Sequence, residues 1–347
     1  MILKLRINVI LLDAGVLGGI QIMTMDTIGI LLQNGYEVHF YTSRLCQNVA
    51  KYLGKYVGKP KVINLPHYQN VTAQMLRYYF MKIKEGISLN MHGDIQPIMS
   101  DAVYFHQFNV DYRIRSPIRE RLKILPQYAL RKSFINKLKK ERKTVLVNSS
   151  WTKAEAKYFW NLEAKILYPP VHIEVKKELP RENSVITVSR FSRDRGLERV
   201  LTLAREMKDV KFILAGHVQD ESYFKELSEK KGENIHIYPN VDEETKTELL
   251  ARSKVYLNPT PYIEGLGVSV IEGMNAGLIP VTRNVGGVID FVPSEFMFND
   301  YNEMREKVEL ALRNWSKDSQ QEMRKRVSRF SPLNYEDNLI KLINELM

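Results

Sequence analysis

The sequence predicts an α/β fold of two doubly wound domains that face one another across a cleft. Short apolar, β-branched segments alternate with amphipathic helical stretches along most of the 347 residues, a pattern typical of parallel sheets with helices on both faces. The apolar segments are nearly continuous, as expected for strands buried on both sides. The chain is also too long for one ordinary core, so two domains are expected. Ligands of such sheets bind outside the carboxyl ends of the strands, which places the expected site in the cleft.

The predicted strands form two series, separated by a proline-rich, charged linker over 168–183. The first series occupies 5–13, 36–43, 61–65, 86–91, 101–108, 144–150 and 164–170. The second series occupies 184–191, 210–216, 234–240, 254–260 and 277–284. We therefore predict an N-terminal domain over 1–170 and a C-terminal domain over 171–328. An amphipathic helix within 329–347 is predicted to pack back on the N-terminal domain.

Composition and charge restrict the class of protein. Hydrophobic residues make up 44% of the chain and charged residues 26%, as in globular proteins. The net charge of +11 indicates an acidic partner, such as a phosphorylated substrate, an anionic lipid or nucleic acid. The single cysteine, Cys46, allows no internal disulfide and fits a reducing compartment. No apolar segment reaches the length of a membrane span and no convincing signal peptide is present, so a cytoplasmic location is expected.

The segment 259–281 is interpreted as a strand end, a glycine-rich loop, a helix and a further strand. Gly265 and Gly267 allow the backbone to approach a ligand closely. A helix beginning near Leu266 would offer free N–H groups and the positive end of its dipole to an anion. This arrangement predicts a phosphate site at the start of the helix.

Two glutamates, Glu264 and Glu272, lie in the loop and in the helix of this segment. Eight helical positions span about 12 Å, which is about the distance from a sugar across a diphosphate to a ribose. One carboxylate could therefore bind a hexose hydroxyl while the other binds the ribose diol. In the alternative interpretation, the first only stabilises the helix by its charge and the second is a solvated helix residue.

The stretch EGLGVSVIEGMNAGLIPVTRNVGG, residues 264–287, resembles the signature of the retaining glycosyltransferases of family 4. The resemblance implies two Rossmann-like domains in the B-type glycosyltransferase (GT-B) fold and a nucleotide-sugar donor held mainly by the C-terminal domain. It implies that Glu264 contacts the donor sugar and that Glu272 holds the ribose. The backbone expected to hold the diphosphate is that of Gly265, Leu266, Gly267 and Val268.

Residues 188–201 resemble the segment in which this family holds the donor diphosphate with an arginine and a lysine. Arg190 matches the arginine, and Arg195 stands where lysine is usual, keeping the charge and adding bidentate phosphate geometry. Two cations could neutralise a departing diphosphate, so neither a metal nor another cofactor is expected beyond a donor of the GDP-mannose or UDP-glucose type. The alternative is a solvated basic loop.

Three residues of the predicted N-terminal domain complete the expected site. Gly18 and Gly19 resemble the family's first glycine loop, which would close over donor phosphates or acceptor; a glycine pair alone often marks only a turn. His106 is expected at the end of a strand, where a family histidine lines the donor-sugar pocket, although an isolated histidine is more often structural. His92 is a weaker candidate of the same kind.

The segment 147–174 resembles that of the α-1,2-mannosyltransferases acting on dolichol-linked oligosaccharide and of their archaeal relatives, although part of it is explained by a serine that caps a helix.

Residues 113–143 hold twelve Lys and Arg, with apolar residues between them. Such a stretch can dock on anionic lipid, or it can be an exposed pair of helices that packs on the core. No nucleic-acid-binding module is recognised, so nucleic acid is not expected as a partner.

The sequence therefore favours a retaining hexosyltransferase that moves mannose or glucose from a nucleotide sugar to a glycan or a lipid-linked saccharide. The residues expected to carry the chemistry are His106, Arg190, Arg195 and Glu264. Alternative functions on the same fold are a sugar-nucleotide epimerase or a phosphorylase. An alternative of another class is a non-catalytic protein that binds anionic surfaces.

Overall fold

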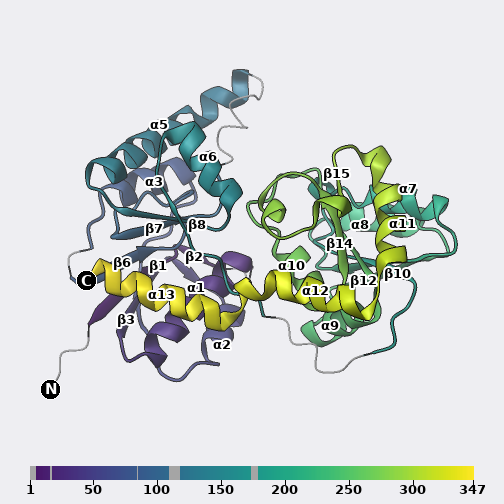
Figure 1. The fold of residues 1–347 in the computed structure, drawn as a ribbon. Helices are drawn as coiled ribbons and strands as arrows, with labels where there is room; N and C mark the ends of the chain where they lie inside the picture. Colours follow the sequence, from purple (N-terminus) through teal and green to yellow (C-terminus); the bar gives the residue numbers. More distant parts are fainter. Residues whose placement is uncertain (1–4, 16–17, 84, 109–117, 173–178) are drawn as a thin grey trace. The chain divides into compact units, whose positions relative to one another are not determined.

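The computed structural model describes residues 5–15, 18–83, 85–108, 118–172 and 179–347. The chain divides into two compact units (Figure 1). The N-terminal unit comprises Met1–Pro170 together with Pro332–Met347, and the C-terminal unit comprises Val171–Ser331. None of the helices in the described ranges combines the length and the apolar character needed to cross a membrane.

A seven-stranded parallel sheet organises the N-terminal unit, in the order β5-β3-β1-β6-β7-β8-β9. Its strands, in sequence order, are β1 (Arg6–Ile10), β3 (Glu37–Thr42), β5 (Lys61–Asn64), β6 (Ile87–Asn90), β7 (Ala102–Phe105), β8 (Thr144–Val147) and β9 (Lys165–Ile166). A separate pair, β2 (Asp13–Ala14) and β4 (Arg44–Leu45), follows two of them. The central strands are almost fully buried, which explains their continuous apolar sequence.

The helices of this unit are α1 (Gly19–Gln33), α2 (Gln47–Leu53), α3 (Val71–Tyr79), α5 (Ile118–Lys140), α6 (Ser150–Trp160) and α13 (Pro332–Leu346). The last of these, α13, runs beside α1 in the N-terminal unit, as predicted for the C-terminal segment (Figure 1). Tyr335 anchors it through a buried hydrogen bond of 2.6 Å between its hydroxyl group and that of Thr27. The amphipathic face therefore carries a specific polar contact as well as apolar packing.

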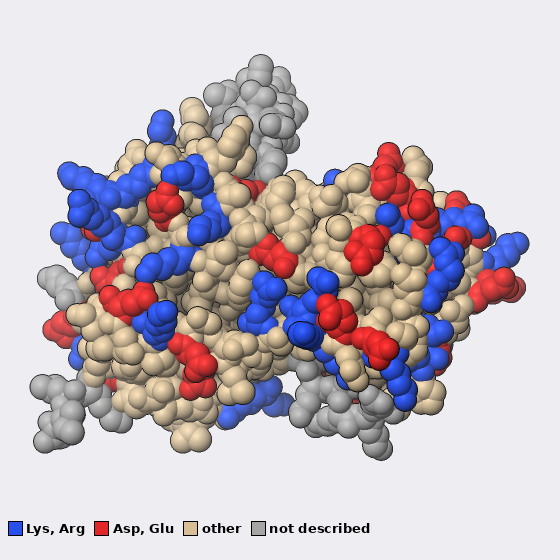
Figure 2. All heavy atoms as spheres, in the orientation of Figure 1, with Lys and Arg blue, Asp and Glu red and all other residues tan. Residues whose placement is uncertain are grey.

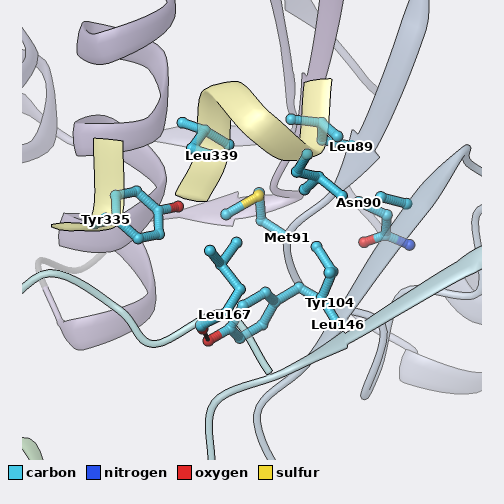
Figure 3. A pocket seen from close by; sticks show the side chains of 10 residues that line it. Leu89, Asn90, Met91, Tyr104, Leu146, Leu167, Tyr335 and Leu339 are labelled. Atoms are coloured by element: carbon cyan, nitrogen blue, oxygen red, sulfur yellow. Dashed lines mark hydrogen bonds between the residues drawn. The ribbon is translucent and has the colours of Figure 1, made fainter. Parts of the chain in front are cut away.

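A small apolar cavity remains between α13 and the sheet (Figure 3). Its lining is Leu89, Asn90, Met91, Ala102, Tyr104, Leu146, Leu167, Tyr335, Leu339 and Leu342. The Tyr104 hydroxyl donates a hydrogen bond to the Leu167 carbonyl oxygen at 2.7 Å. The Asn90 side chain is already bound to the carbonyl oxygens of Gln96 and Ile98. The lining contains no charged residue and offers few polar groups to a ligand, so we interpret the cavity as a packing space.

A six-stranded parallel sheet organises the C-terminal unit, in the order β12-β11-β10-β13-β14-β15. Its strands are β10 (Ser184–Val188), β11 (Lys211–Gly216), β12 (Ile235–Pro239), β13 (Val255–Leu257), β14 (Ile279–Arg283) and β15 (Met297–Phe298). The α-helices are α7 (Glu198–Glu206), α8 (Glu221–Lys230), α9 (Glu243–Arg252), α10 (Val268–Asn275), α11 (Met304–Asn314) and α12 (Lys317–Val327). Both sheets are parallel, so the predicted α/β class with two doubly wound units is confirmed.

Each of the twelve predicted strand segments contains a strand, but some details differ. The short strands β2, β4 and β15 were not predicted, whereas β9, which is equally short, lies within a longer predicted segment, 164–170. The helix expected near Leu266 begins at Val268, since Gly267 has a φ of +87° and a left-handed residue cannot belong to the helix. Ser149 is the helix-capping serine, accepting a hydrogen bond from the Thr152 N–H at 3.0 Å. Within the predicted linker, 173–178 lie outside the described residues.

Candidate active site

The candidate site of the C-terminal unit forms at the carboxyl ends of its central strands. Arg190 lies two residues beyond β10, and Asn258 directly follows β13, its neighbour in the sheet. Arg195 ends a short 3₁₀ turn, Arg193–Arg195, that precedes α7. Parallel strands place all of their carboxyl ends at one edge, which is why segments far apart in sequence meet here.

Arg195 and Glu264, predicted separately from two motifs, are in direct contact. Nη1 of Arg195 donates a hydrogen bond to Oε1 of Glu264 at 2.7 Å. The side-chain amide of Asn258 donates to the other carboxylate oxygen, Oε2, at 3.0 Å. The arginine and glutamate side chains are only 19% and 25% exposed. The carboxylate is therefore fixed on both oxygens, one by a cation and one by a neutral amide.

Arg190 lies on the same loop but is more accessible, with 46% of its side chain exposed. Its guanidinium donates to Oε1 of Gln219 at 2.6 Å and lies 3.7 Å from an Asp194 carboxylate oxygen. Partial burial lowers the pKa of Arg190, and the nearby positive charge of Arg195 lowers it further. The carboxylates of Asp194 and Glu264 act in the opposite direction, so the two arginines share this region with two acidic groups.

The glycines of this region are required by close packing of two loops. The Gly287 N–H donates to the Glu264 carbonyl oxygen at 3.0 Å. Gly286 has a φ of +86°, and a Cβ there would lie 2.4 Å from the same oxygen. Gly286 and Gly287 thus pack closely against the loop that carries Glu264. Gly267, as the N-cap of α10, provides no side chain to cap that helix and leaves its start open.

Glu272 lies on α10, and its partner is Lys246 of α9. The ammonium group is 3.2 Å from Oε1 of Glu272 and 2.8 Å from an Oε2 of Glu243. Burial raises the pKa of Glu272, and Lys246 opposes that effect. Burial also lowers the pKa of Lys246, but the two carboxylates outweigh it and the net shift is upward. The lysine thus supports the ionised form of the glutamate.

A hollow on the surface of the C-terminal unit lies beside Glu264. It is lined by Asn258, Thr260, Tyr262, Glu264, Thr282, Arg283, Val285 and Val288. Arg283 is held there by a hydrogen bond of 2.8 Å to the Pro261 carbonyl oxygen. The lining is rich in hydroxyl and amide groups, which suits a polyhydroxylated ligand.

In the N-terminal unit, His106 directly follows β7, as predicted. Its Nε2 donates a hydrogen bond to the Met91 carbonyl oxygen at 2.9 Å, so Nδ1 is the acceptor nitrogen of the neutral ring. His92 is adjacent, with the two ring centroids 5.6 Å apart. Burial lowers the pKa of both histidines, that of His92 to about 4. Both rings are therefore neutral at physiological pH.

Two buried charged residues support this histidine pair. The Asp94 carboxylate accepts the backbone N–H groups of His106 and Gln107 at 2.8 and 3.0 Å. Arg131 of α5 is 3% exposed and donates to the carbonyl oxygens of Asp94 and Gln107 at 3.2 and 3.3 Å. Arg131 was predicted only as part of the basic stretch 113–143, and its burial shows that this cation is structural.

Gly18 is the N-cap of α1 and Gly19 its first residue, so the predicted glycine loop does lead into a helix start. No side chain caps this end either, and no acidic residue lies in its first turn. Residues 16–17 of the loop lie outside the described residues. The geometry is compatible with an anion but does not identify one.

The structure thus joins Arg195 with Glu264, places Arg190 on the same loop, and places Glu272 on α10. Supporting residues were not predicted: Asn258, Lys246, Gln219, Asp94 and Arg131. The position of Asn258 directly after a predicted strand was a signal that could have been used. The sequence contained no such signal for Lys246, because a lysine in a charged helix is usually solvated.

Comparisons with known proteins show what this chain is similar to. Residues 171–330 match the family model described as glycosyl transferases group 1. The match covers nearly the whole of the C-terminal unit. The match supports the predicted resemblance to glycosyltransferases, and the matched residues include Arg190, Arg195, Glu264 and Glu272.

Two curated relatives of this chain are named enzymes. The GDP-Man:Man(3)GlcNAc(2)-PP-Dol alpha-1,2-mannosyltransferase of Dictyostelium discoideum is 23% identical over 278 residues, 70% of this chain and 55% of the relative. The glycogen synthase of Aquifex aeolicus is 30% identical over 122 residues, 35% of this chain and 25% of the relative. The chain thus spans about half or less of the length of these relatives.

Solved glycosyltransferase structures confirm the predicted GT-B fold. Sucrose-phosphate synthase from Thermosynechococcus elongatus superposes with a TM-score of 0.73 at 16% identity, covering 99% of each chain. The HepE protein of Anabaena in complex with UDP-glucose gives 0.72 at 13% identity, covering 99% of this chain and 100% of that one. At these identities the comparison establishes the fold alone.

Proposed function

We propose that this chain is a retaining hexosyltransferase that moves mannose or glucose from a nucleoside diphosphate sugar to a glycan or a lipid-linked saccharide. The contact between Arg195 and Glu264 carries the proposal, because it joins the cation assigned to the donor phosphate and the carboxylate assigned to the donor sugar, both within the segment that matches a glycosyltransferase family model. The named mannosyltransferase relative favours GDP-mannose, and the named glycogen synthase favours a glucose donor.

In this proposal, Arg190 and Arg195 hold the donor diphosphate together with the backbone from Gly265 to Val268. The bond from the anomeric carbon to the phosphate oxygen breaks, and the two cations stabilise the negative charge that develops there. The acceptor hydroxyl attacks from the face that the diphosphate leaves, and a departing phosphate oxygen takes its proton. The cations thereby take the part that a metal ion has in other transferases.

The remaining predicted residues recognise the sugar, the ribose and the phosphates of the donor in this proposal. Glu264, fixed by Arg195 and Asn258, accepts a hydrogen bond from a donor-sugar hydroxyl. Glu272 accepts hydrogen bonds from the ribose diol. His106 offers Nδ1 as an acceptor to the sugar, since its Nε2 proton is already bound by Met91. The loop at Gly18 and Gly19 is assigned to the phosphates or the acceptor.

A lipid-linked acceptor would bring the N-terminal unit close to a membrane surface, and the basic stretch suits this. Figure 2 shows Lys and Arg gathered over the part of this unit that holds α5. Among the residues of α5 and the following turn whose side chains are described, from Leu125 onward, the exposed basic ones are Lys132, Lys139, Lys140 and Arg142. Exposed apolar side chains accompany it: Leu125 on α5, with Leu76 and Phe80 on and beside its neighbour α3. Residues 113–117 lie outside the described residues.

The donor assignment is tested by thermal-shift titration with UDP, GDP, ADP and their sugar conjugates. A ligand at 100 times its Kd adds about 2.7 kcal/mol of stability. We expect a shift with one base and its loss in Glu272→Ala, followed by sugar transfer to a saccharide acceptor with retention of the anomeric configuration. No shift with any nucleotide contradicts the proposal. Donor turnover without acceptor would indicate an epimerase, and dependence on inorganic phosphate would indicate a phosphorylase.

The membrane contact is tested separately by co-flotation with vesicles of neutral lipid or with added anionic lipid. Each basic residue near an anionic surface contributes about 1 kcal/mol. A variant with Lys132, Lys139 and Lys140 changed to glutamine should lose most binding to anionic vesicles and keep nucleotide binding. Equal flotation of variant and wild type would show that this surface is not the contact.

A further inference from the structure

The ion pair between Lys246 and Glu272 is one of two in the described part of the C-terminal unit, with that of Arg195 and Glu264, in which both side chains are at most a quarter exposed. The side chains of Lys246 and Glu272 are 12% and 17% exposed. By contrast, the pair between Lys230 and Glu226 has side chains that are 61% and 37% exposed. An ion pair of low exposure is costly to desolvate, so its presence on two surface helices calls for an explanation.

The geometry leaves half of the glutamate available. Lys246 lies at 3.2 Å from Oε1 of Glu272, and no described residue donates a hydrogen bond to Oε2. The Glu272 side chain is 17% exposed, so it is not completely closed to solvent. Lys246 thus binds one oxygen of the carboxylate, and the other oxygen is left to accept hydrogen bonds from a ligand.

The other groups around Glu272 do not replace the lysine. Glu243 of α9 is 84% exposed and of the same charge as Glu272. The Tyr256 hydroxyl of β13 donates to the Val188 carbonyl oxygen at 3.0 Å. On α12, which packs against α10, Nε of Arg324 donates to the carbonyl oxygen of Asn275 at 3.2 Å. Lys246 is thus the described cation that binds the carboxylate directly.

We infer that Lys246 is a positioning residue that keeps Glu272 ionised and oriented to accept hydrogen bonds from the vicinal diol of a ribonucleoside diphosphate. The inference rests on the proposed function, and it extends that function from the glutamate to the residue that makes the glutamate a selective acceptor. A carboxylate accepts two hydroxyl protons of a diol, whereas a protonated carboxyl would itself donate one. Because burial favours the protonated form of Glu272, an adjacent cation is needed to preserve the acceptor.

The test measures Kd by calorimetry for the nucleoside diphosphate that the wild type binds and for its 2′-deoxy analogue. Lys246→Met should raise the Kd of the ribonucleotide about tenfold, which corresponds to about 1.4 kcal/mol, and should reduce the preference for ribose over deoxyribose. Lys246→Arg should restore most of both. Lys230→Met, on an exposed ion pair of the same unit, should change neither.

Two further readouts separate positioning from a purely structural role. In a Glu272→Gln background, Lys246→Met should have no additional effect on Kd, because it acts through that carboxylate. The pH below which binding is lost should move upward in Lys246→Met, since the pKa of Glu272 would rise without the cation. The same loss of affinity in both backgrounds, or an unchanged ribose preference, would overturn the inference.

The outcomes also distinguish this inference from the proposed function. If the wild type binds no nucleoside diphosphate, both are wrong. If the wild type binds one, Glu272→Gln weakens it and Lys246→Met does not, the donor site stands and the role of Lys246 is rejected. The melting temperature of each variant is measured in parallel, so that a loss of folding is recognised.

Discussion

Replacing Arg195 with alanine perturbs the contact on which the donor site depends. The charge-assisted hydrogen bond to Glu264 is 2.7 Å long and its two side chains are mostly shielded from water. Such a bond contributes about 1.5–3 kcal/mol. The same guanidinium is proposed to stabilise the departing diphosphate, and loss of a preorganised contact of this kind costs about 100-fold in turnover, or about 2.7 kcal/mol. We therefore expect Arg195→Ala to lower kcat about 100-fold.

The assay is release of nucleoside diphosphate at saturating donor and acceptor, with the melting temperature measured in parallel. Arg193 provides a matched control, because it lies in the same 3₁₀ turn but is 59% exposed and pairs with Glu226 at 3.0 Å. Arg193→Ala should remain within about twofold of the wild type, as expected for an exposed ion pair. Arg195→Lys keeps the charge and should recover part of the lost activity.

Two results would refute this reasoning. If folded Arg195→Ala keeps kcat within about threefold of the wild type, the guanidinium does not contact the charge that develops in the reaction. If Arg193→Ala loses as much activity as Arg195→Ala, the effect belongs to the general charge of the loop. A double-mutant cycle with Glu264→Gln measures the coupling directly, and residues in contact should show about 0.5–3 kcal/mol.

Three further predictions concern single residues. Arg190→Ala should reduce turnover more than about 100-fold, about 2.7 kcal/mol, and near-normal activity would contradict its assignment to the diphosphate. Burial lowers the pKa of His92 to about 4 from 6.5, so the unfolded chain binds more protons between these values and stability falls as the pH drops through this window. In urea unfolding, the wild type should lose about 2 kcal/mol more than His92→Gln between pH 7 and pH 5, and equal losses would contradict the shift. Tyr335→Phe removes the buried hydrogen bond to Thr27 and should lower the free energy of unfolding by about 1 kcal/mol, whereas an unchanged value would show that the bond adds nothing.

The basic stretch shows where charge counting from the sequence was too coarse. Arg131 and Lys132 are adjacent in sequence, yet the first is buried against Asp94 and the second is exposed. Both residues add the same charge to the chain. Arg131, however, is buried and binds the loop that carries His106, whereas Lys132 is exposed and can contact an external partner. A sequence alone does not separate the two roles, because α5 carries lysine and arginine along most of its length.

The sequence by itself determined the class of fold, the position of every major strand and the glycosyltransferase motif. These features are local: they depend on hydrophobic runs, on glycine positions and on spacings along the chain. Arg190, Arg195, Glu264 and Glu272 could be chosen because the segments that contain them resemble motifs of a known family.

Only the tertiary structure decided which of these residues touch and what supports them. The contacts of Arg195 with Glu264 and of Lys246 with Glu272 join residues 69 and 26 positions apart. Parallel sheets bring such positions together through crossover helices, and no local pattern records which side chains meet at the strand ends. The same packing sets the burial that raises the pKa of Glu272 and lowers that of His92. The chemistry of these groups was therefore determined by their neighbours in space, which the sequence does not show.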